Sequence, residues 1–433
     1  MKVVIVGGGI TGLSAALELA GKAEVVLLEQ SNRLGGKLCT AHLETPLGKA
    51  IVDGGAESFI TRKPEAYKLA QELGLEVLDG GAETKGVFLL RDQEIMEIPT
   101  NLLAFLASKL LSSKGKLRAL QEPWTRGAAS QTDESLDGFL TRRIGQEAAN
   151  IFGTVMAGIY NTNPKEMSLQ ASFGVLHQLE QEHGSLLRGM LKQKRKTKKQ
   201  PSAVSLQSGM QALIEALETK LRAFGTEIRT NTPIAKVESN KVFLESGKVL
   251  PADAIILACP APSSARLLEG EVSLALNALR HTGLGTVALA YPAFALEPLR
   301  AYRGIMIPKS ENRAISAVLF TSHKMPSRVP KGVGLVRVFF DPHQLPQSDT
   351  ALLEVIRREL REILQLEALP LAHQVFRWSD FPVLEVGHLE RVAKAEALLP
   401  KGVYLAGASY RGLGVPDCIR QGQETARRIF SRA

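Results

Sequence analysis

The chain has 433 residues, of which 45% are hydrophobic and 22% are charged. This composition is typical of a folded globular protein of about two or three domains, and it excludes a disordered chain, a collagen-like fibre and a polytopic membrane protein. The formal net charge is +9, but six of the basic residues lie in residues 192–199, so the rest of the chain carries only 9 − 6 = +3.

Cysteines, signals and apolar stretches indicate where the protein works. Cys39, Cys259 and Cys418 are far apart and odd in number, which argues against a disulfide framework, and no Cys-x-x-Cys pair or histidine-rich cluster suggests a metal site. Neither a secretory signal nor an apolar run of the ~20 residues that a membrane-spanning helix needs is found. We therefore expect a cytoplasmic protein without a bound metal.

The basic run at residues 192–199 has two interpretations. It is either a solvated loop or a segment drawn to anionic lipid at the inner face of the cell membrane. No aromatic residue is interleaved with these bases, so nucleic-acid binding is not expected.

The first elements predicted along the chain are a strand, a glycine turn and a helix. Residues 3–6 are apolar, as in a parallel strand buried on both faces, and Gly7, Gly9 and Gly12 follow in G-x-G-x-x-G spacing. The first glycine permits the tight turn, the second lets a pyrophosphate approach the backbone, and the third lets the helix pack on the strand. A second apolar strand ends at Glu29, whose carboxylate can accept ribose hydroxyls. This context predicts a dinucleotide site.

The residues after Glu29 indicate which dinucleotide is bound. Arg33, Gly35 and Gly36 resemble the E-x-x-x-R-x-G-G extension of FAD-binding amine oxidases, desaturases and porphyrinogen oxidases. FAD binds in an extended form, so a second stretch of backbone has to pass close to its pyrophosphate. The resemblance implies that a further glycine segment, residues 53–59, lies along the flavin; the alternative is a plain hairpin turn.

Later segments complete the predicted nucleotide domain. Residues 227–260 indicate short strands with a turn at Ser239 and Asn240, and they resemble the adenine-side strands of the same superfamily. Residues 403–406 indicate a buried strand, followed by a glycine turn and by Pro416, which suits the first position of a helix. The positive end of that helix suits the N1–C2=O edge of a flavin, which becomes negative on reduction.

The middle of the chain is predicted to be helical. Residues 95–210 carry amphipathic patterns, including Leu102, Leu103, Leu106 and Leu110 and a second set between residues 176 and 187. Two interpretations stay open: a plain helical subdomain with its own core, or a surface that docks on lipid near a hydrophobic substrate entrance.

The most specific resemblance is to the oxygen-dependent protoporphyrinogen and coproporphyrinogen oxidases. It covers essentially the whole chain and is carried by residues 98–100 (IPT), 157–161 (AGIYN), 179–190 (LEQEHGSLLRGM) and 412–419 (GLGVPDCI). The resemblance implies a six-electron oxidation of a porphyrinogen to the porphyrin in haem biosynthesis, with non-covalent FAD, O2 as acceptor and H2O2 as by-product. Aromatisation favours the product, so flavin N5 does the chemistry, the protein positions the substrate, and no catalytic side chain is expected.

The implied fold is α/β, or α+β overall: a split Rossmann-like FAD-binding domain, a mixed-sheet substrate domain and a helical, membrane-facing insertion. Expected boundaries are 1–60, 210–265 and 385–433 for the discontinuous FAD-binding domain, 61–95 and 266–384 for the substrate-binding domain, and 96–209 for the insertion. The implied partners are the porphyrinogen, O2, a membrane surface and the next enzyme of the haem pathway.

The residues expected to hold FAD lie in the glycine segments or in the strands beside them. They are Gly7, Gly8, Gly9, Ile10, Thr11, Gly12, Glu29, Gln30, Arg33, Gly36, Lys37, Gly54, Gly55, Ala56, Glu57, Val237, Trp378, Gly407, Gly414, Val415 and Pro416. The residues expected to contact substrate are Gly158, whose carbonyl would face the pyrrole N–H groups, the wall residues Met306 and Leu319, and the bases Arg62, Lys63 and Arg303.

One position departs from the family pattern. Leu103 stands where some members place an arginine that holds a propionate, so we expect the carboxylate anchor at Arg62, Lys63 or Arg303. His183 is expected to hydrogen-bond a helix, and Cys418 is not expected to bind flavin covalently. Protoporphyrinogen IX and coproporphyrinogen III both stay open as substrates. Two other classes also stay open: another amine oxidase or carotenoid-type desaturase, and a non-catalytic escort module of the same fold.

Overall fold

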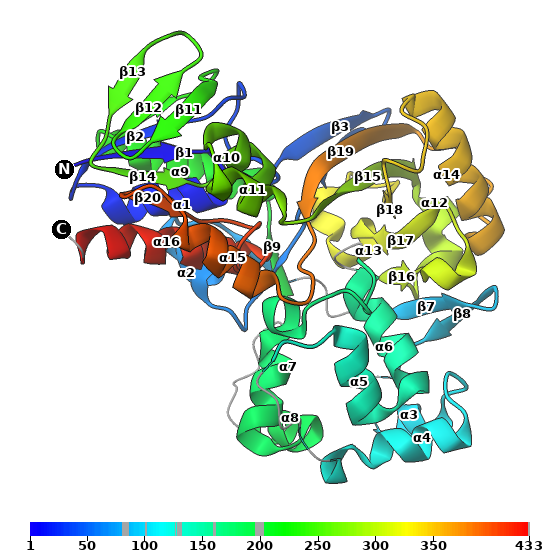
Figure 1. The fold of residues 1–433 in the computed structure, drawn as a ribbon. Helices are drawn as coiled ribbons and strands as arrows, with labels where there is room; N and C mark the ends of the chain where they lie inside the picture. The colour runs from blue at the N-terminus through cyan, green and yellow to red at the C-terminus, as the bar shows by residue number, and fades with distance from the viewer. Residues whose placement is uncertain are drawn as a thin grey trace.

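The computed structural model describes residues 1–79, 86–99, 102–125, 127, 132–158, 162–194 and 203–431. Two large sheets lie side by side, with a group of helices below them in the view of Figure 1. Both termini lie at the first sheet, so the two ends of the chain belong to one body (Figure 1). Within the described ranges, no helix combines the length and apolar character needed to cross a membrane.

The first sheet is parallel and is assembled from three distant parts of the chain. Its order is β10 (Glu227–Arg229), β2 (Glu24–Leu28), β1 (Lys2–Val6), β14 (Ala254–Leu257) and β20 (Val403–Leu405). The predicted strands at residues 3–6, 25–28, 254–260 and 403–406 all join it. Parallel strands need covered faces, which explains why these segments are almost wholly apolar.

Both faces of the first sheet are covered. Val3 and Ile5 pack in a core with α1 (Ile10–Leu19), α9 (Gln211–Ala223) and α16 (Val415–Phe430). Val4 and Val6 pack on the opposite side in a second core. That side is covered by β11 (Ile234–Glu238), β12 (Lys241–Leu244), β13 (Val249–Pro251), α10 (Ala261–Leu267), α11 (Glu271–Asn277) and α15 (His388–Ala397). The turn predicted at Ser239 and Asn240 joins β11 to β12.

The second sheet is mixed. Its order is β19 (Ala372–Pro382), β15 (His281–Pro292), β18 (Val333–Phe340), β17 (Ile315–Phe320), β16 (Gly304–Met306), β7 (Phe88–Arg91) and β8 (Glu94–Glu97). Among these described pairs, β16 and β7 are parallel and the others are antiparallel. Side chains alternate along a strand, so Val336, Val338 and Phe340 of β18 pack on one face against α14 (Asp349–Leu364). Arg337 and Phe339 belong to the opposite face.

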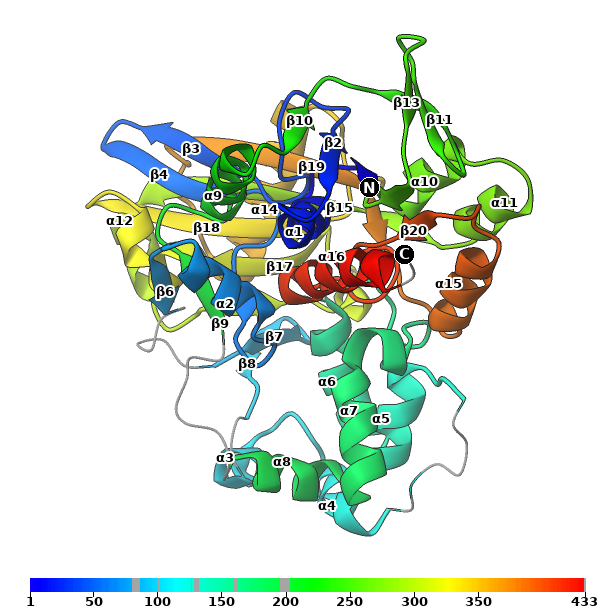
Figure 2. The same ribbon diagram turned by 90° about the vertical axis from the view of Figure 1, so that its left-hand side faces the viewer.

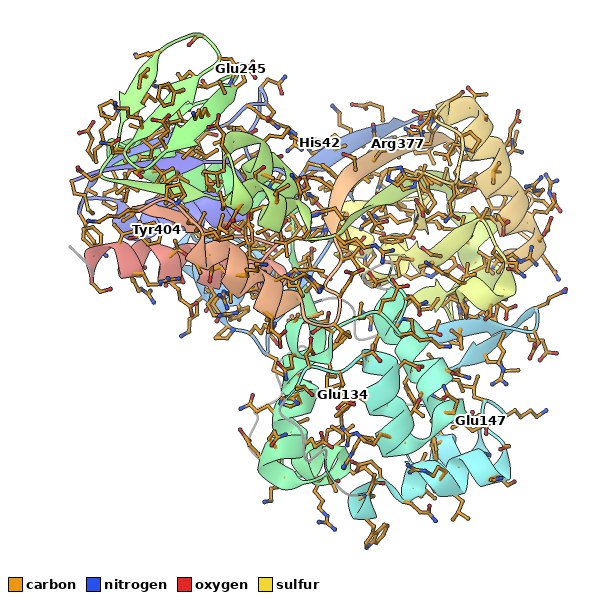
Figure 3. All side chains as sticks on the ribbon, viewed as in Figure 1. His42, Glu134, Glu147, Glu245, Arg377 and Tyr404 are labelled. Atoms are coloured by element: carbon orange, nitrogen blue, oxygen red, sulfur yellow. The ribbon has the colours of Figure 1, made fainter. Side chains whose placement is uncertain are left out.

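This opposite face is covered at its two ends. At one end lies a ribbon of β3 (Thr40–Thr45) and β4 (Gly48–Asp53), which packs on Ala288 and Leu335. Figure 3 labels His42 on β3 and Arg377 on β19. At the other end, Met306 and Ala317 pack against α6 (Gln146–Gly158). The middle of the face, between these covers, carries Leu319, Arg337 and Phe339.

Short elements connect the two sheets. The segment after β4 leads to β5 (Phe59–Ile60), which pairs with β9 (Ala203–Leu206) beside β6 (Val77–Asp79). Between β5 and β6 lies α2 (Glu65–Glu72). Other short elements lie between strands of the second sheet: α12 (Ala293–Leu296), η2 (Glu297–Leu299), η3 (Lys309–Glu311), α13 (Thr321–Lys324) and η4 (Pro326–Arg328). Gly54 and Gly55 therefore do not form a hairpin, because the chain passes from the ribbon into a different sheet.

The predicted helical part is observed. It consists of α3 (Leu102–Ala107), α4 (Ser113–Leu120), η1 (Glu122–Trp124), α5 (Leu136–Ile144), α6, α7 (Leu169–His183) and α8 (Leu186–Lys194) (Figures 1 and 2). Two helical patterns end earlier than expected. α3 stops at Ala107, which leaves Leu110 outside it, and a left-handed Gly184 ends α7 before α8 begins. The domain boundaries stay a prediction.

Candidate functional site

The first glycine run has the three environments that its spacing predicts. Gly7 has φ +109°, and a Cβ there would lie 2.9 Å from the Ala258 carbonyl oxygen. A Cβ on Gly12 would overlap the Gly7 carbonyl oxygen, so only glycine lets α1 pack this closely on β1. A Cβ on Gly9 would meet no atom within 4 Å. The space in front of Gly9 is therefore open at the start of α1, where backbone N–H groups attract an anion.

The second glycine run lies directly beside the first. The Gly35 N–H donates to the Gly8 carbonyl (2.8 Å), and Gly9 and Gly35 pair as an isolated parallel bridge. The Arg33 guanidinium donates to the Leu34 carbonyl (3.1 Å) and the Gly36 carbonyl (2.7 Å), so it holds this turn. The two runs together leave backbone without side chains on both sides of the open space.

Glu29 stands at the end of β2 next to this space. One carboxylate oxygen accepts from the Gly8 N–H (2.8 Å), and the other accepts from the Ser31 N–H (2.9 Å) and hydroxyl (2.8 Å). The carboxylate is thus held at the mouth of the glycine turn. Gln30 is exposed beside it, and Lys37 pairs with Asp380 at 2.9 Å.

The third glycine segment joins the two sheets. A Cβ on Gly55 would overlap the Lys37 carbonyl oxygen, so this segment runs against the second glycine run. The Gly54 carbonyl accepts from the Trp378 Nε1–H (3.1 Å) and from the Thr286 hydroxyl (3.1 Å). The Gly55 carbonyl accepts from Arg337 (2.9 Å). Side chains of the second sheet therefore set the position of both peptide groups.

Two predicted FAD-binding residues lie in unexpected surroundings. The Glu57 carboxylate accepts from Thr321 (2.6 Å) and Lys324 (2.8 Å) of the second sheet's connections, so it is already paired. Burial acts to raise the pKa of Glu57, but the charges of Lys324 and Arg337 outweigh it and lower the pKa to about 2. Val237 is buried in β11, where it packs in the second core of the first sheet, the parallel sheet of the predicted nucleotide domain.

The C-terminal turn closes the same region. Gly414 caps α16 without a side-chain cap, so N–H groups of its first turn stay free for a ligand. Pro416 occupies the second helical position, one later than predicted. Gln421 was missed from the sequence. Its Oε1 accepts from the Gly407 N–H (3.3 Å) and the Arg411 N–H (3.2 Å), so it ties the end of β20 to α16.

The predicted substrate residues are partly brought together. The Met306 methyl group occupies the place that a Cβ on Gly158 would take, which puts α6 directly on β16. Leu319 pairs with Gly304 on the same face of the sheet. Residues 159–161, which carry part of the family motif, lie outside the described residues, as do Thr100 and residues 195–199 of the basic run.

The three candidate bases differ in how free they are. The Lys63 ammonium donates to both carboxylate oxygens of Asp417 at 2.7 Å, and Arg62 is exposed. Arg303 is half-buried, and burial lowers its pKa, partly offset by the charge of Asp79. No carboxylate of the described residues lies within ion-pair distance of Arg303. Lys63 is thus already engaged by Asp417, whereas Arg62 and Arg303 have no carboxylate partner among the described residues, and of these two only Arg303 is half-buried.

Arg337 and Arg328 were also missed. Each is a single base within an apolar or turn-forming run, and each is about 1% exposed. Arg328 pairs with Asp53 at 2.6 Å and donates to the Ser205 hydroxyl at 2.7 Å. For Arg337, the signal available in the sequence was its charge inside the apolar strand Val333–Phe340. An isolated base at such a position needs a buried acceptor.

Burial raises the pKa of the thiols of Cys39, Cys259 and Cys418. Cys418 is buried at the start of α16, and burial raises the pKa of its thiol to about 11. Such a thiol is protonated at neutral pH and is a poor nucleophile.

Comparisons with known proteins agree with this geometry. A family model described as flavin containing amine oxidoreductase matches residues 10–430. The coproporphyrinogen III oxidase of Bacillus subtilis (strain 168) is 31% identical, covering 97% of this chain and 96% of its own. The human protoporphyrinogen oxidase is 28% identical over 98% of this chain and 97% of its own. A crystal structure from Exiguobacterium sp. 255-15, described as a protoporphyrinogen oxidase, superposes with a TM-score of 0.84 at 26% identity, covering 100% of this chain and 99% of the other.

Proposed function

Because the chain belongs to the flavin-containing amine oxidoreductase family, we propose that it is an FAD-dependent oxidase that converts a porphyrinogen into the porphyrin, with O2 as acceptor, in haem biosynthesis. The observation that carries this proposal is the meeting of three glycine segments at Gly9, Gly35 and Gly55, next to a sheet face that Gly158 and Met306 approach. The relatives named above have porphyrinogen oxidase activities and cover nearly the whole chain.

The residues present fit FAD. The open space at Gly9 and the start of α1 suits the pyrophosphate, Glu29 suits the ribose hydroxyls, and the uncapped start of α16 suits the flavin edge that becomes negative on reduction. When bound, the flavin accepts reducing equivalents from the substrate and returns them to O2. Cys418 is buried and burial raises the pKa of its thiol, which supports the proposal that FAD is held without a covalent bond.

The protein's own part in the reaction is to position and enclose. Leu319 and Phe339 present apolar side chains on the middle of this face, where a macrocycle can lie, and Met306 with Gly158 bounds that space where α6 packs on β16. Because aromatisation favours the product, orientation against the flavin supplies most of what the chemistry requires. We propose Arg303, which is half-buried and lies just before β16, as the anchor of a substrate propionate.

A side-by-side assay tests the function. The purified protein should be yellow, should release free FAD on acid denaturation, and should oxidise coproporphyrinogen III or protoporphyrinogen IX in air well above the spontaneous rate, read by porphyrin fluorescence. Background rates with both substrates would reject porphyrinogen oxidation in favour of another amine oxidase or desaturase. A protein that stays colourless after incubation with FAD would favour the escort class.

The propionate anchor has its own test. Arg303→Gln should raise KM for the better porphyrinogen about tenfold with a smaller change in kcat, because a charge-assisted hydrogen bond is lost in the ground state and the transition state alike. Arg300→Gln is the matched control, since Arg300 is a neighbouring, exposed arginine paired with Glu297. An unchanged KM in Arg303→Gln would leave Arg62 and Lys63 as the remaining candidates.

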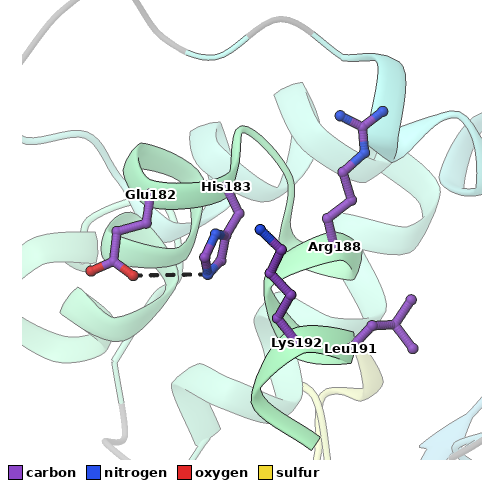
Figure 4. Close-up of a pocket in the computed structure, with 5 residues that line it drawn as sticks. All are labelled: Glu182, His183, Arg188, Leu191 and Lys192. Atoms are coloured by element: carbon purple, nitrogen blue, oxygen red, sulfur yellow. Dashed lines mark ion pairs between the residues drawn. The ribbon is translucent and has the colours of Figure 1, made fainter. Parts of the chain in front are cut away.

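The finer proposal for the helical part is peripheral contact with an anionic membrane. Its exposed apolar side chains include Leu103 (80% exposed), Trp124 (77%) and Leu191 (63%). Figure 2 shows α3, α8 and α4 along one edge of the molecule. A shallow cup of about 440 Å³ lies between the end of α7 and α8, and it is lined by Glu182, His183, Arg188, Leu191 and Lys192 (Figure 4). Apolar side chains flanked by bases are typical of helices that lie in a lipid interface.

Vesicle sedimentation tests this contact. The protein should sediment with phosphatidylglycerol-containing vesicles and less with phosphatidylcholine alone, and Leu103→Glu with Leu191→Glu should abolish the difference. Leu274→Glu is the control, because Leu274 is 73% exposed on α11, outside the helical part. Equal sedimentation of all variants would remove the membrane from the proposal. Handover of product to the next haem-pathway enzyme also remains a proposal.

A further inference from the structure

A buried cluster of three charged side chains lies where the second sheet meets the third glycine segment. Glu57 is paired with Lys324 at 2.8 Å, and Arg337 Nη1 lies 3.8 Å from the other carboxylate oxygen. The exposed fractions of the Glu57, Lys324 and Arg337 side chains are 5%, 16% and 1%. The cluster is therefore shielded from solvent and from salt.

The charges of this cluster do not balance. One carboxylate faces two cations, and the lowered pKa of Glu57 keeps it ionised, so the surplus is one positive charge. Arg337 is the less well paired cation, since its Nε is buried without a hydrogen-bond partner. A buried charge that is incompletely paired costs folding free energy, and an apolar residue between Ala288 and Leu319 would avoid that cost. Packing alone does not explain Arg337.

Arg337 contacts the segment expected beside the flavin. Its Nη2 donates to the Gly55 carbonyl at 2.9 Å, while Trp378 and Thr286 hold the Gly54 carbonyl. Three side chains of one sheet thus fix two consecutive peptide groups. Leu319, a predicted wall residue, is the cross-strand neighbour of Arg337, so the same strand pair contacts both the glycine segment and the substrate face.

We propose that Arg337, together with Glu57 and Lys324, positions the flavin-side segment and that the surplus positive charge of this cluster favours reduction of the bound FAD. The inference rests on the proposed function, because it takes the Gly54–Gly55 segment to lie along the flavin. A two-electron reduced flavin carries added negative charge. A fixed cation in a site without water stabilises such charge far more than it would in solvent.

The reduction potential of the bound FAD tests this directly. In the full-length holoprotein, Arg337→Met and Lys324→Met each remove one positive charge, so the potential should become more negative than in the wild type. Glu57→Gln removes the negative charge, so the potential should become more positive. Opposite signs distinguish charge from damaged packing, which has no reason to follow the sign of the charge removed.

Two further variants complete the design. Arg337→Lys keeps the charge, so its flavin potential should lie between those of Arg337→Met and the wild type. Its flavin circular dichroism should differ from that of the wild type, because the contact with the Gly55 carbonyl is changed. Arg313→Gln is the control, since Arg313 pairs with Glu359 and Glu362 on the α14 side of the sheet and should leave the potential unchanged.

Several results would overturn the proposal. Wild-type potentials in both Arg337→Met and Lys324→Met would do so, and so would a negative shift in Glu57→Gln. If Arg337→Met fails to fold, as judged by thermal melting, the opposed pair Lys324→Met and Glu57→Gln decides. The potential is measured without porphyrinogen, so a protein that binds FAD but fails the porphyrinogen assay loses the proposed substrate and not this inference.

Discussion

Gly9 and Gly12 stand three residues apart and serve opposite purposes. A Cβ on Gly12 would overlap the backbone of Gly7, whereas a Cβ on Gly9 would point into open space. The fold therefore requires glycine at position 12, whereas glycine at position 9 leaves room for the ligand. The first requirement concerns folding and the second concerns FAD binding.

Substitution of each glycine should therefore give different defects. Gly9→Val should leave the melting temperature of the FAD-free protein near that of wild type but weaken FAD binding at least tenfold, because its side chain enters the space for the pyrophosphate. Gly12→Ala should cost about 1–3 kcal/mol of folding free energy through overpacking. Thermal melting and FAD titration measure the two effects, and normal FAD affinity in Gly9→Val would contradict the placement of the pyrophosphate.

His388 makes the stability sensitive to acid. It is 1% exposed, its Nε2 contacts the Tyr410 carbonyl at 3.0 Å, and burial, with smaller effects from neighbouring charges, lowers its pKa from 6.5 to about 4. Between pH 6.5 and 4, His388 is therefore protonated in the unfolded chain but neutral in the folded chain. We therefore expect the contribution of His388 to stability to be full above pH 6.5 and to be lost as the pH drops toward 4, by at most about 3 kcal/mol.

Replacement of His388 should flatten this dependence. Urea unfolding of His388→Gln should show a smaller loss of stability between pH 6.5 and 4 than the wild type, because the titrating group is gone. His42→Gln, at an exposed position on β3 (Figure 3), is the control and should keep the wild-type slope. Identical slopes for all three proteins would show that His388 is not the group responsible.

At the scale of elements, the contact between α1 and α16 joins the two ends of the chain. A Cβ on Gly422 would overlap the Thr11 carbonyl oxygen and lie 3.0 Å from the Ala15 backbone nitrogen. The two helices cover the same face of the nucleotide sheet, and each begins at a glycine turn of the predicted FAD site. The close approach of these helices therefore also fixes the distance between the two turns.

A methyl group at Gly422 should force the helices apart. Gly422→Ala should lower stability by about 1–3 kcal/mol and weaken FAD binding together with it, since both helix starts move. Gly174→Ala is the matched control within a helix, because a Cβ there meets nothing within 4 Å and alanine favours helix. Chemical denaturation and FAD titration give the comparison, and a stable Gly422→Ala protein would contradict the tight packing.

At the scale of the whole molecule, one buried ion pair joins distant segments. Arg328 of η4 pairs with Asp53 at the end of β4, and neither side chain is exposed. Asp53 also accepts from the Thr40 hydroxyl (2.6 Å) and the Met210 N–H (2.8 Å), and Arg328 donates to the Ser205 hydroxyl. The pair thereby connects the β3–β4 ribbon, the sheet of β5, β9 and β6, the start of α9 and the η4 turn before β18.

Removal of one partner should be costly. Arg328→Met should lower stability by about 3–5 kcal/mol, because it leaves the Asp53 charge buried with fewer partners. Arg222→Gln breaks an exposed pair with Glu218 on α9 and should have a far smaller effect. Equilibrium unfolding of both proteins gives the difference, and equal stabilities would show that Asp53 finds other partners.

Local patterns determined the parts of this protein that depend on neighbours in sequence. The glycine spacing before α1, the apolar strands of the nucleotide sheet, the turn between β11 and β12 and the helical middle follow from backbone sterics and side-chain periodicity, which act over a few residues. Two predicted helices were too long. One was extended to Leu110 and the other across Gly184, because side-chain periodicity does not show where a turn ends a helix.

Tertiary structure decided which distant groups meet. The surplus cation at Arg337, the engagement of Lys63 by Asp417 and of Glu57 by Lys324, and the free guanidinium of Arg303 depend on contacts between residues up to 354 positions apart. Charge and residue type are visible in the sequence, but burial and the nearest counter-charge are set by packing. The role of a charged residue therefore depends on the partner that the tertiary structure places beside it.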